Sequence, residues 1–349
     1  ALNFLICTII GWLNRMYFKQ NILISIGYQI NKEPDSLIQI GQQVALIGID
    51  PEIADVIRRD LFQCSYNFSK LQFFDLGNTR KNNPEFLAQL FTELNSNKMH
   101  LIILGADNQF TKTMARITET RENIAIIDKT FYSLLESDTF SYLAGNHNIE
   151  KIKLISYQSH LVHSIHLNSP KMNQSLSLGD LRNNMRDAEP ALRDVSLIDF
   201  HLSSIRYGEI PGIPGTTPSG LSSEEACQLM KYIGLNPLKS RFWIRGYNPK
   251  FDFHSQGVKM VSQLIWYYLE GLDQKVDEQP DKKFLTQYIV AMSDYQINLT
   301  FWKSEISGRW WVEIPIQGSE PYLLPCSFMD YKIACNDEMP KRIMNELSL

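Results

Sequence analysis

From residue 43 onward the sequence alternates short apolar runs with longer amphipathic ones, and this alternation constrains the fold more than any other feature. Runs such as Gln43–Ile49 have the length and composition of buried strands, whereas Pro51–Cys64 repeats apolar residues at helical spacing. Strands that alternate with helices favour a mostly parallel sheet covered by helices on both faces. We therefore predict a three-layer α/β/α fold, with functional residues at the carboxyl ends of its strands.

The same patterns place the remaining elements. Further strands are expected at 71–76, 100–104, 124–127, 151–157, 195–200 and 241–247, and further helices at 84–94, 110–117, 222–233 and 258–272. Ser222 and Glu225 have the spacing of a capping box, which supports the start of the helix that follows them.

The character of the sequence changes on both sides of this region. Leu2–Trp12 is apolar but shorter than the roughly 20 residues of a spanning helix, which favours a buried or subunit-interface helix over membrane-surface association. After residue 272, a charged linker precedes β-like runs that contain Trp302, Trp310 and Trp311. We predict an N-terminal segment (1–42), an α/β domain (43–272) and a C-terminal appendage (273–349) packed on that domain, with Trp310 and Trp311 helping to fix it.

Charge and cysteine content exclude several classes of protein. A net charge of -4 over 349 residues gives no electrostatic basis for binding nucleic acid or an anionic membrane, and no membrane span is expected. The five cysteines are scattered and form no CxxC motif, which argues against a disulfide scaffold or a structural zinc site. We expect a cytoplasmic protein.

Six short motifs follow the predicted strand ends or helix starts. They are Asp75–Asn78 (DLGN), Leu104–Gln109 (LGADNQ), Ile126–Tyr132 (IIDKTFY), Val195–Arg206 (VSLIDFHLSSIR), Pro211–Leu221 (PGIPGTTPSGL) and Tyr247–Pro249 (YNP). In order and spacing they resemble the motifs of the arginase, agmatinase and formimidoylglutamase family, the ureohydrolases, and look closest to a divergent bacterial branch of it. The resemblance covers residues 43 to 272 and implies the ureohydrolase fold.

The resemblance also implies a site, because these enzymes hold two manganese ions that activate a bridging water. Two histidines and four aspartates ligate the ions in the family. Here Asp128 alone keeps the family's ligand type, and the other matching positions are Asn108, Thr130, Tyr132, His201 and Ser203. His201 is a possible substitute ligand. A slip of the alignment by two residues would instead put Asp199 and His201 at the two liganding acids.

Substrate-binding positions of the family are altered as well. The glutamate that binds the guanidinium group falls at Gly246, beside Arg245, and Arg206 falls at a third acidic position. An arginine there would repel a cationic substrate. We predict that Asp107, Arg206, Arg245 and Gly246 line the cleft, and that the loop after the first strand is short because Asp50 leads directly into a helix.

Other histidines are weaker candidates. His147 lies near the position of a catalytic-acid histidine in the family, but the sequence favours an exposed loop residue. The three-residue spacing of His160, His163 and His166 would put them on one face if they lay on a helix, where they could bind a metal. They follow a predicted strand, however, so a polar loop is the favoured interpretation.

Three functions remain open from these residues. The favoured one is an inactive ureohydrolase-fold protein with a binding or scaffolding role, no cofactor, and an unknown small molecule or protein as partner. The second is a hydrolase of linear amidine C–N bonds with a rearranged manganese site on Asp128 and His201. The third is a binding module in which Arg206 and Arg245 hold an anionic ligand. In each case the family and the apolar segments imply a homo-oligomer.

Overall fold

The computed structural model describes residues 24–26, 42–95, 99–130, 137–172, 174–276, 278, 280–316 and 319–347. The apolar segment Leu2–Trp12 and the motif residue Tyr132 lie outside these residues, so what the sequence predicts for them stays a prediction.

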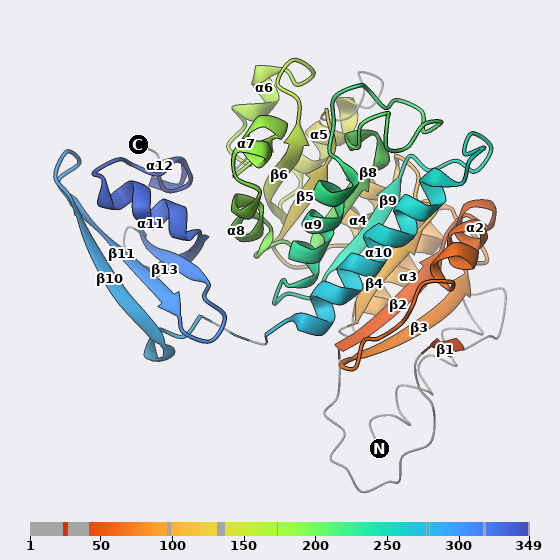
Figure 1. Ribbon diagram of the computed structural model, residues 1–349, viewed down its shortest axis with the longest axis horizontal. Helices are drawn as coiled ribbons and strands as arrows, with labels where there is room; N and C mark the ends of the chain where they lie inside the picture. The colour runs from red at the N-terminus through yellow and green to blue at the C-terminus, as the bar shows by residue number, and fades with distance from the viewer. Residues whose placement is uncertain are drawn as a thin grey trace, which may run out of the picture.

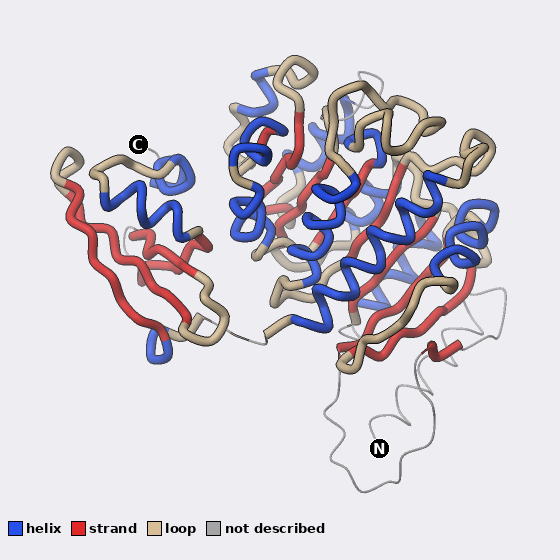
Figure 2. The backbone as a smooth tube through the Cα atoms, in the orientation of Figure 1, coloured by secondary structure: helices blue, strands red, loops and turns tan. Residues whose placement is uncertain are grey.

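A nine-stranded sheet lies at the centre of the described chain (Figures 1 and 2). Its order is β1-β3-β2-β4-β9-β8-β5-β6-β7, and every pairing is parallel except that of β1 with β3. The strands are β1 (Ile24–Ile26), β2 (Gln42–Gly48), β3 (Leu71–Asn78), β4 (His100–Leu104), β5 (Glu122–Ile127), β6 (Ile149–Tyr157), β7 (Leu176–Ser177), β8 (Leu197–His201) and β9 (Arg241–Arg245).

Helices cover both faces of this sheet, as Figure 1 shows. None of the described helices is both long and apolar enough to cross a membrane. One face carries α2 (Pro51–Leu61), α7 (Leu178–Asn183), α8 (Ala188–Leu192), α9 (Ser223–Gly234) and α10 (Gln256–Gln274). The other carries α3 (Pro84–Asn95), α4 (Phe110–Arg116) and α5 (Ser137–Gly145), and a short helix, α6 (Ser164–Leu167), follows β6.

This arrangement confirms the predicted three-layer α/β/α fold. All five residues of β4 are buried, because a parallel strand between two helical layers has no face in water. The predicted capping box is present at α9, where Ser222 and Glu225 cap one another. The loop after β2 is as short as expected, since Asp50 is already the N-cap of α2 and accepts a hydrogen bond from the Glu52 amide at 2.9 Å.

The C-terminal region forms a second, antiparallel sheet in the order β10-β11-β12-β13. Two helices pack on one face, where Ala334 and Ile343 join its apolar core. The first of these helices is not predicted from the sequence pattern, because its exposed apolar residues, such as Phe328 and Met329, break the helical periodicity. The elements are η4 (Lys282–Phe284), β10 (Leu285–Met292), β11 (Ile297–Ser304), β12 (Trp310–Ile316), β13 (Ser319–Cys326), α11 (Phe328–Cys335) and α12 (Lys341–Leu347).

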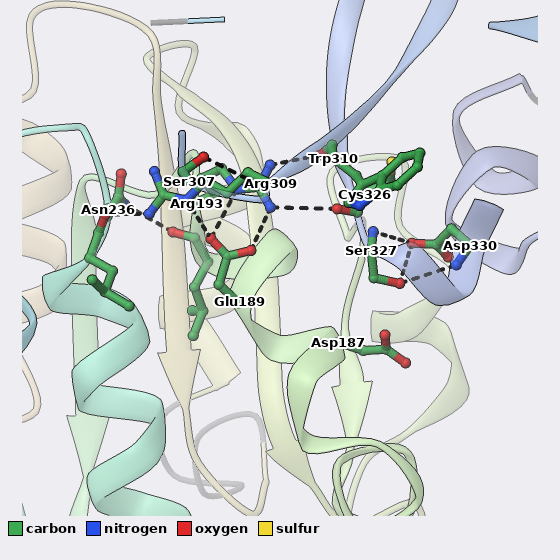
Figure 3. A network of polar contacts seen from close by, with 12 residues as sticks. Asp187, Glu189, Arg193, Asn236, Ser307, Arg309, Trp310, Cys326, Ser327 and Asp330 are labelled. Atoms are coloured by element: carbon green, nitrogen blue, oxygen red, sulfur yellow. Dashed lines mark hydrogen bonds and ion pairs between the residues drawn. The ribbon is translucent and has the colours of Figure 1, made fainter. Parts of the chain in front are cut away.

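A cluster of charged side chains joins the two sheets (Figure 3). Arg193, directly after α8, donates a hydrogen bond to the carbonyl of Trp310 at 2.8 Å, and its guanidinium lies 4.9 Å from the centre of the Trp311 ring. Glu189 pairs with both Arg193 and Arg309, the latter at 3.2 Å. One carboxylate therefore neutralises two guanidinium groups that contact opposite sides of the junction.

Candidate functional site at the strand ends

The motif residues converge at the carboxyl ends of three adjacent strands. Strand β8 lies between β5 and β9, and His201 at its end is paired in register with Arg245 at the end of β9. Asp128 directly follows β5, whose last residue is paired with Phe200. Parallel strands bring their carboxyl ends to one edge of a sheet, so the topology alone places these residues together.

Ser203 links Asp128 to His201. Its hydroxyl oxygen lies 3.2 Å from Oδ1 of Asp128 and 2.7 Å from Nδ1 of His201. The amide nitrogen of Ser203 also lies 3.2 Å from Nδ1, so both polar groups of Ser203 contact this ring nitrogen. Burial lowers the pKa of His201 from its ordinary value, against the opposing effect of Asp128, so the ring is held neutral.

Lys129 ties this group to the Gly- and Pro-rich loop 208–220. Its amide donates to Oδ1 of Asp128 at 2.7 Å, and its ammonium group donates to the carbonyl of Gly215. Gln158 holds the same loop through the carbonyl of Ser219, at 2.9 Å. Burial lowers the pKa of the Lys129 ammonium, although Asp128 raises it. The loop therefore closes over the end of β5, and Lys129 is the residue that connects the two.

A buried ion pair lies beside this group. Nε of Arg245 is 2.7 Å from Oδ1 of Asp199, and the two side chains are 1% and 0% exposed. Thr111 on α4 donates to the other oxygen of Asp199 at 2.6 Å, and Asn108 accepts from Nη1 of Arg245 at 2.8 Å. The carboxylate and the guanidinium are thus both bound by other groups inside the protein.

This pair corrects two predictions. Arg245 does not line a cleft, because it alternates with Ile244 along β9 and so points toward the α4 side of the sheet, into the contact with Asp199. The two-residue slip that would make Asp199 a metal ligand is excluded, since its carboxylate is fully buried on Arg245 and Thr111.

Gly246 and His201 share the space that a larger residue would need. Gly246 has φ +85°, a left-handed conformation that favours glycine, and a Cβ built there would lie 3.0 Å from Cε1 of His201. In the resembling family a glutamate side chain occupies this position. Here the imidazole of His201 fills the place into which that side chain would project.

Several other predicted site residues are directed elsewhere. Thr130 donates to the carbonyl of Leu161 at 2.9 Å instead of turning toward Asp128. Arg206 pairs with Glu209, with its Nε 2.8 Å from the carboxylate, and its side chain is 43% exposed. Asp107 is exposed in the turn before α4. The cationic cleft wall expected from Arg206 and Arg245 is therefore absent from the described residues, because each arginine is paired with a carboxylate.

The remaining histidines lie away from this edge. His147 is exposed in the turn that precedes β6, next to the amino end of β5, so it lies at the opposite end of the parallel strands. The ring centres of His163 and His166 are 6.5 Å apart, and His166 packs against Phe140 at 4.6 Å. Within the ranges that the structure describes, no three His, Cys, Asp or Glu residues are grouped so that they could hold a metal ion.

Arg58 is a residue that sequence reasoning missed. Its Nε lies 2.9 Å from Asp75, the acid of the DLGN motif, and its Nη2 donates to the carbonyl of Gly77 at 2.8 Å. Asp55 and Asn78 complete this cluster. One indication of this role is present in the sequence, an arginine on the inner face of the helix that follows the shortened loop. Asp75 is consequently neutralised by the protein itself.

The donor set does not fit a pair of manganese ions. Two adjacent dications require several carboxylates to offset their mutual repulsion. At the matching positions that the structure describes, Asp128 is the one carboxylate, and its Oδ1 accepts hydrogen bonds from Ser203 and Lys129. Asp199, on the neighbouring strand β8, is already paired with a buried arginine. Asp75 lies on β3, which four strands separate from β5, so it is remote from Asp128.

No family model matches the sequence, and no curated protein matches it. Solved structures do match. A formiminoglutamase from Trypanosoma cruzi is 13% identical, with a TM-score of 0.59 over 71% of this chain and 97% of that one. The formimidoylglutamase of Bacillus subtilis is 18% identical, with a TM-score of 0.56 over 73% of this chain and 97% of that one. A hypothetical agmatinase from Burkholderia thailandensis is 12% identical, with a TM-score of 0.54 over 68% and 87%. At this low sequence identity the likeness shows the fold alone: the chain shares the α/β/α fold of these structures and adds a four-stranded antiparallel sheet at the C-terminal end.

Proposed function

We propose that this chain is a catalytically inactive protein of the arginase fold that acts by binding or scaffolding. The observation that supports this best is the state of Asp128. It is the one position that keeps the family's ligand type, and its Oδ1 already accepts hydrogen bonds from the Ser203 hydroxyl and the Lys129 amide. The proposal treats residues 43–272 as the ureohydrolase-like domain and 273–349 as an appendage.

The surrounding charges support the same proposal. Recruiting Asp199 to a metal would break its pair with Arg245 and leave a buried arginine without its counter-charge. Breaking one buried pair costs about 3–5 kcal/mol. Two manganese ions would also place their charge beside the Lys129 ammonium, which packs over the end of β5. Each of these terms opposes a dinuclear site.

A second function has one observation in its favour. Ser203 contacts both Asp128 and His201, so these two side chains lie close enough to share a hydroxyl group. One metal ion bound between them would give a reduced site for hydrolysis of a linear amidine C–N bond, and manganese would be its cofactor. Such a site would require Nδ1 of His201 to exchange its contacts with Ser203 for the metal.

Metal analysis combined with an activity assay distinguishes the two functions. The purified chain is dialysed against manganese, its metal content is measured, and release of urea and ammonia is followed with arginine, agmatine and formimidoylglutamate. We expect no stoichiometric manganese and no turnover. Two manganese ions per chain, or turnover above about 1 s⁻¹, at the low end for ordinary enzymes, would contradict inactivity.

A matched pair of variants locates any metal that does bind. Asp128→Asn removes the buried carboxylate, whereas Asp107→Asn removes an exposed one three residues after the end of β4. One manganese ion lost only in Asp128→Asn would support the reduced site. Equal metal content in both variants would show that the ion is bound elsewhere on the protein.

A further inference from the structure

Strand β10 forms an edge of the C-terminal sheet that no other strand of the described chain covers. It pairs with β11 along its whole length without a shift in register. The opposite edge, β13, lies against α8, and its Cys326 carbonyl accepts a hydrogen bond from Arg193 at 3.5 Å. In Figure 1, β10 is the outermost strand, on the side away from the parallel sheet. One edge of this sheet is thus used in the junction and the other is open.

The open edge lacks the features that usually protect such strands. Its sequence, Leu-Thr-Gln-Tyr-Ile-Val-Ala-Met, contains no charged residue, no proline and no glycine. Edge strands normally carry a charge, a proline or a bulge, because a regular apolar edge pairs readily with another chain. Ile289, at the middle of β10, is 64% exposed. These properties are typical of an edge strand that pairs with another chain.

Residues flanking β10 are arranged almost symmetrically about Ile289. Phe284, five residues before it, is 74% exposed, and Tyr295, six residues after it, is 43% exposed. Lys283 and Asp294 stand beside these two aromatics and are also exposed. The strip therefore presents a basic and aromatic end, an apolar centre, and an acidic and aromatic end.

We propose that β10 pairs antiparallel with β10 of a second copy of this chain, across a two-fold axis at Ile289. Such an axis, perpendicular to the sheet, keeps the two apolar cores on the same side and sets Ile289 against itself. The axis sets position 284 opposite position 294 and position 283 opposite position 295, so the Lys283–Phe284 end of each copy lies beside the Asp294–Tyr295 end of the other. A parallel pairing would instead set lysine against lysine and aspartate against aspartate, which repel. The charges thus select a second copy in the antiparallel orientation.

This inference does not rest on the proposed function, since β10 is remote from the strand ends of the parallel sheet. Light scattering of the full chain at micromolar concentration tests it. Ile289→Lys places two ammonium groups at the axis and should halve the mass. Ile306→Lys is the matched control, because Ile306 is 75% exposed in the turn between β11 and β12 and should leave the mass unchanged.

A charge exchange separates loss of pairing from loss of folding. Lys283→Asp or Asp294→Lys alone should weaken self-association at least about tenfold, and the double variant should restore it. Lys283 lies in η4 before β10 and Asp294 in the turn after it, and the eight-residue strand between them spans roughly 26 Å, so within one chain they cannot compensate for one another. A monomeric wild-type chain, an unchanged mass for Ile289→Lys, or a double variant no stronger than the singles would overturn the proposal.

Discussion

Arg245 and Asp199 form an ion pair beneath the strand ends, 2.7 Å apart and closed to solvent. In an enzyme of the resembling family, carboxylates at this edge are directed to metal ions. Here Asp199 is directed to an arginine instead, and Asp75, on β3 farther along the sheet, pairs with Arg58. Both carboxylates are therefore neutralised within the protein.

We predict that Arg245→Ala destabilises the fold by about 3–5 kcal/mol, because it leaves the Asp199 carboxylate buried without a counter-charge. Arg245→Met combined with Asp199→Leu should recover much of this loss, since neither charge then remains. Urea unfolding monitored by circular dichroism measures the stability of the single and the double variant. Lys250→Ala, which breaks an exposed pair with Glu52 at 3.7 Å, is the control and should shift the midpoint little. A single variant as stable as the wild type would contradict the buried pair.

The neutral state of His201 predicts a dependence of stability on pH. Burial lowers its folded-state pKa below the ordinary value of 6.5. The unfolded chain then binds the proton more tightly, so stability falls as the pH drops below about 6.5 toward the folded-state pKa. His100, whose pKa burial also lowers, acts with the same sign, so the comparison is between wild type and His201→Gln.

We expect the variant to lose less stability than the wild type between about pH 7.5 and about pH 5.5. Unfolding midpoints at the two pH values give the difference, and a proton NMR titration of the His201 ring gives its pKa directly. A ring that titrates above 6.5 would contradict the assignment, because it would mean that the charge of Asp128 outweighs burial.

Alanine substitutions of the two adjacent tryptophans should affect the appendage in different ways. Trp310 stacks on Tyr331 at 4.9 Å inside the appendage core, whereas Trp311 faces Arg193 of the α/β domain. Each change to alanine removes a buried aromatic and should cost about 3–5 kcal/mol. Trp310→Ala should unfold the appendage. Trp311→Ala should release it folded, which limited proteolysis within 275–284 detects as faster cleavage. Identical cleavage patterns for both variants would refute this division.

The overall fold was predictable because hydrophobic periodicity is local. Each strand is a short apolar run and each major helix has an apolar face, so element types and their alternation could be read within windows of about 11–18 residues. The motif order then placed Asp128, His201 and Gly246 at one edge, and the structure brings these three together. Helix α11 was missed because its apolar residues do not gather on one face.

The pairing within the site was not predictable, because it depends on direction and distance. Arg58 and Asp75 form their ion pair only when α2 packs beside β3. No local sequence pattern predicts that packing. The direction of Arg245 follows from the alternation of β9, but its partner Asp199 stands on another strand. The sequence predicts which ligand positions of the family carry other residues. It does not indicate that Asp75 and Asp199 are paired with arginines.

Gly246 and His201 occupy adjacent space, so substitutions at the two positions should be coupled. Gly246→Glu restores the residue that binds the guanidinium group in the resembling family, but it adds a side chain at φ +85° and sets a Cβ 3.0 Å from the His201 ring. We expect a loss of about 1–3 kcal/mol from the backbone conformation, an additional loss from the contact, and no gain of activity. Gly246→Ala carries the same Cβ without the charge and should account for most of the effect.

A double-mutant cycle with His201→Ala isolates the contact between the two positions. Removing the ring opens the space that the new side chain needs, so Gly246→Glu should be less harmful in this background, with a coupling of about 0.5–3 kcal/mol. The positive φ remains in both backgrounds, so the rescue should be partial. Urea midpoints of the four proteins give the coupling. Strictly additive losses would show that Gly246 is retained for its backbone alone, and that His201 does not occupy the position of the family's glutamate.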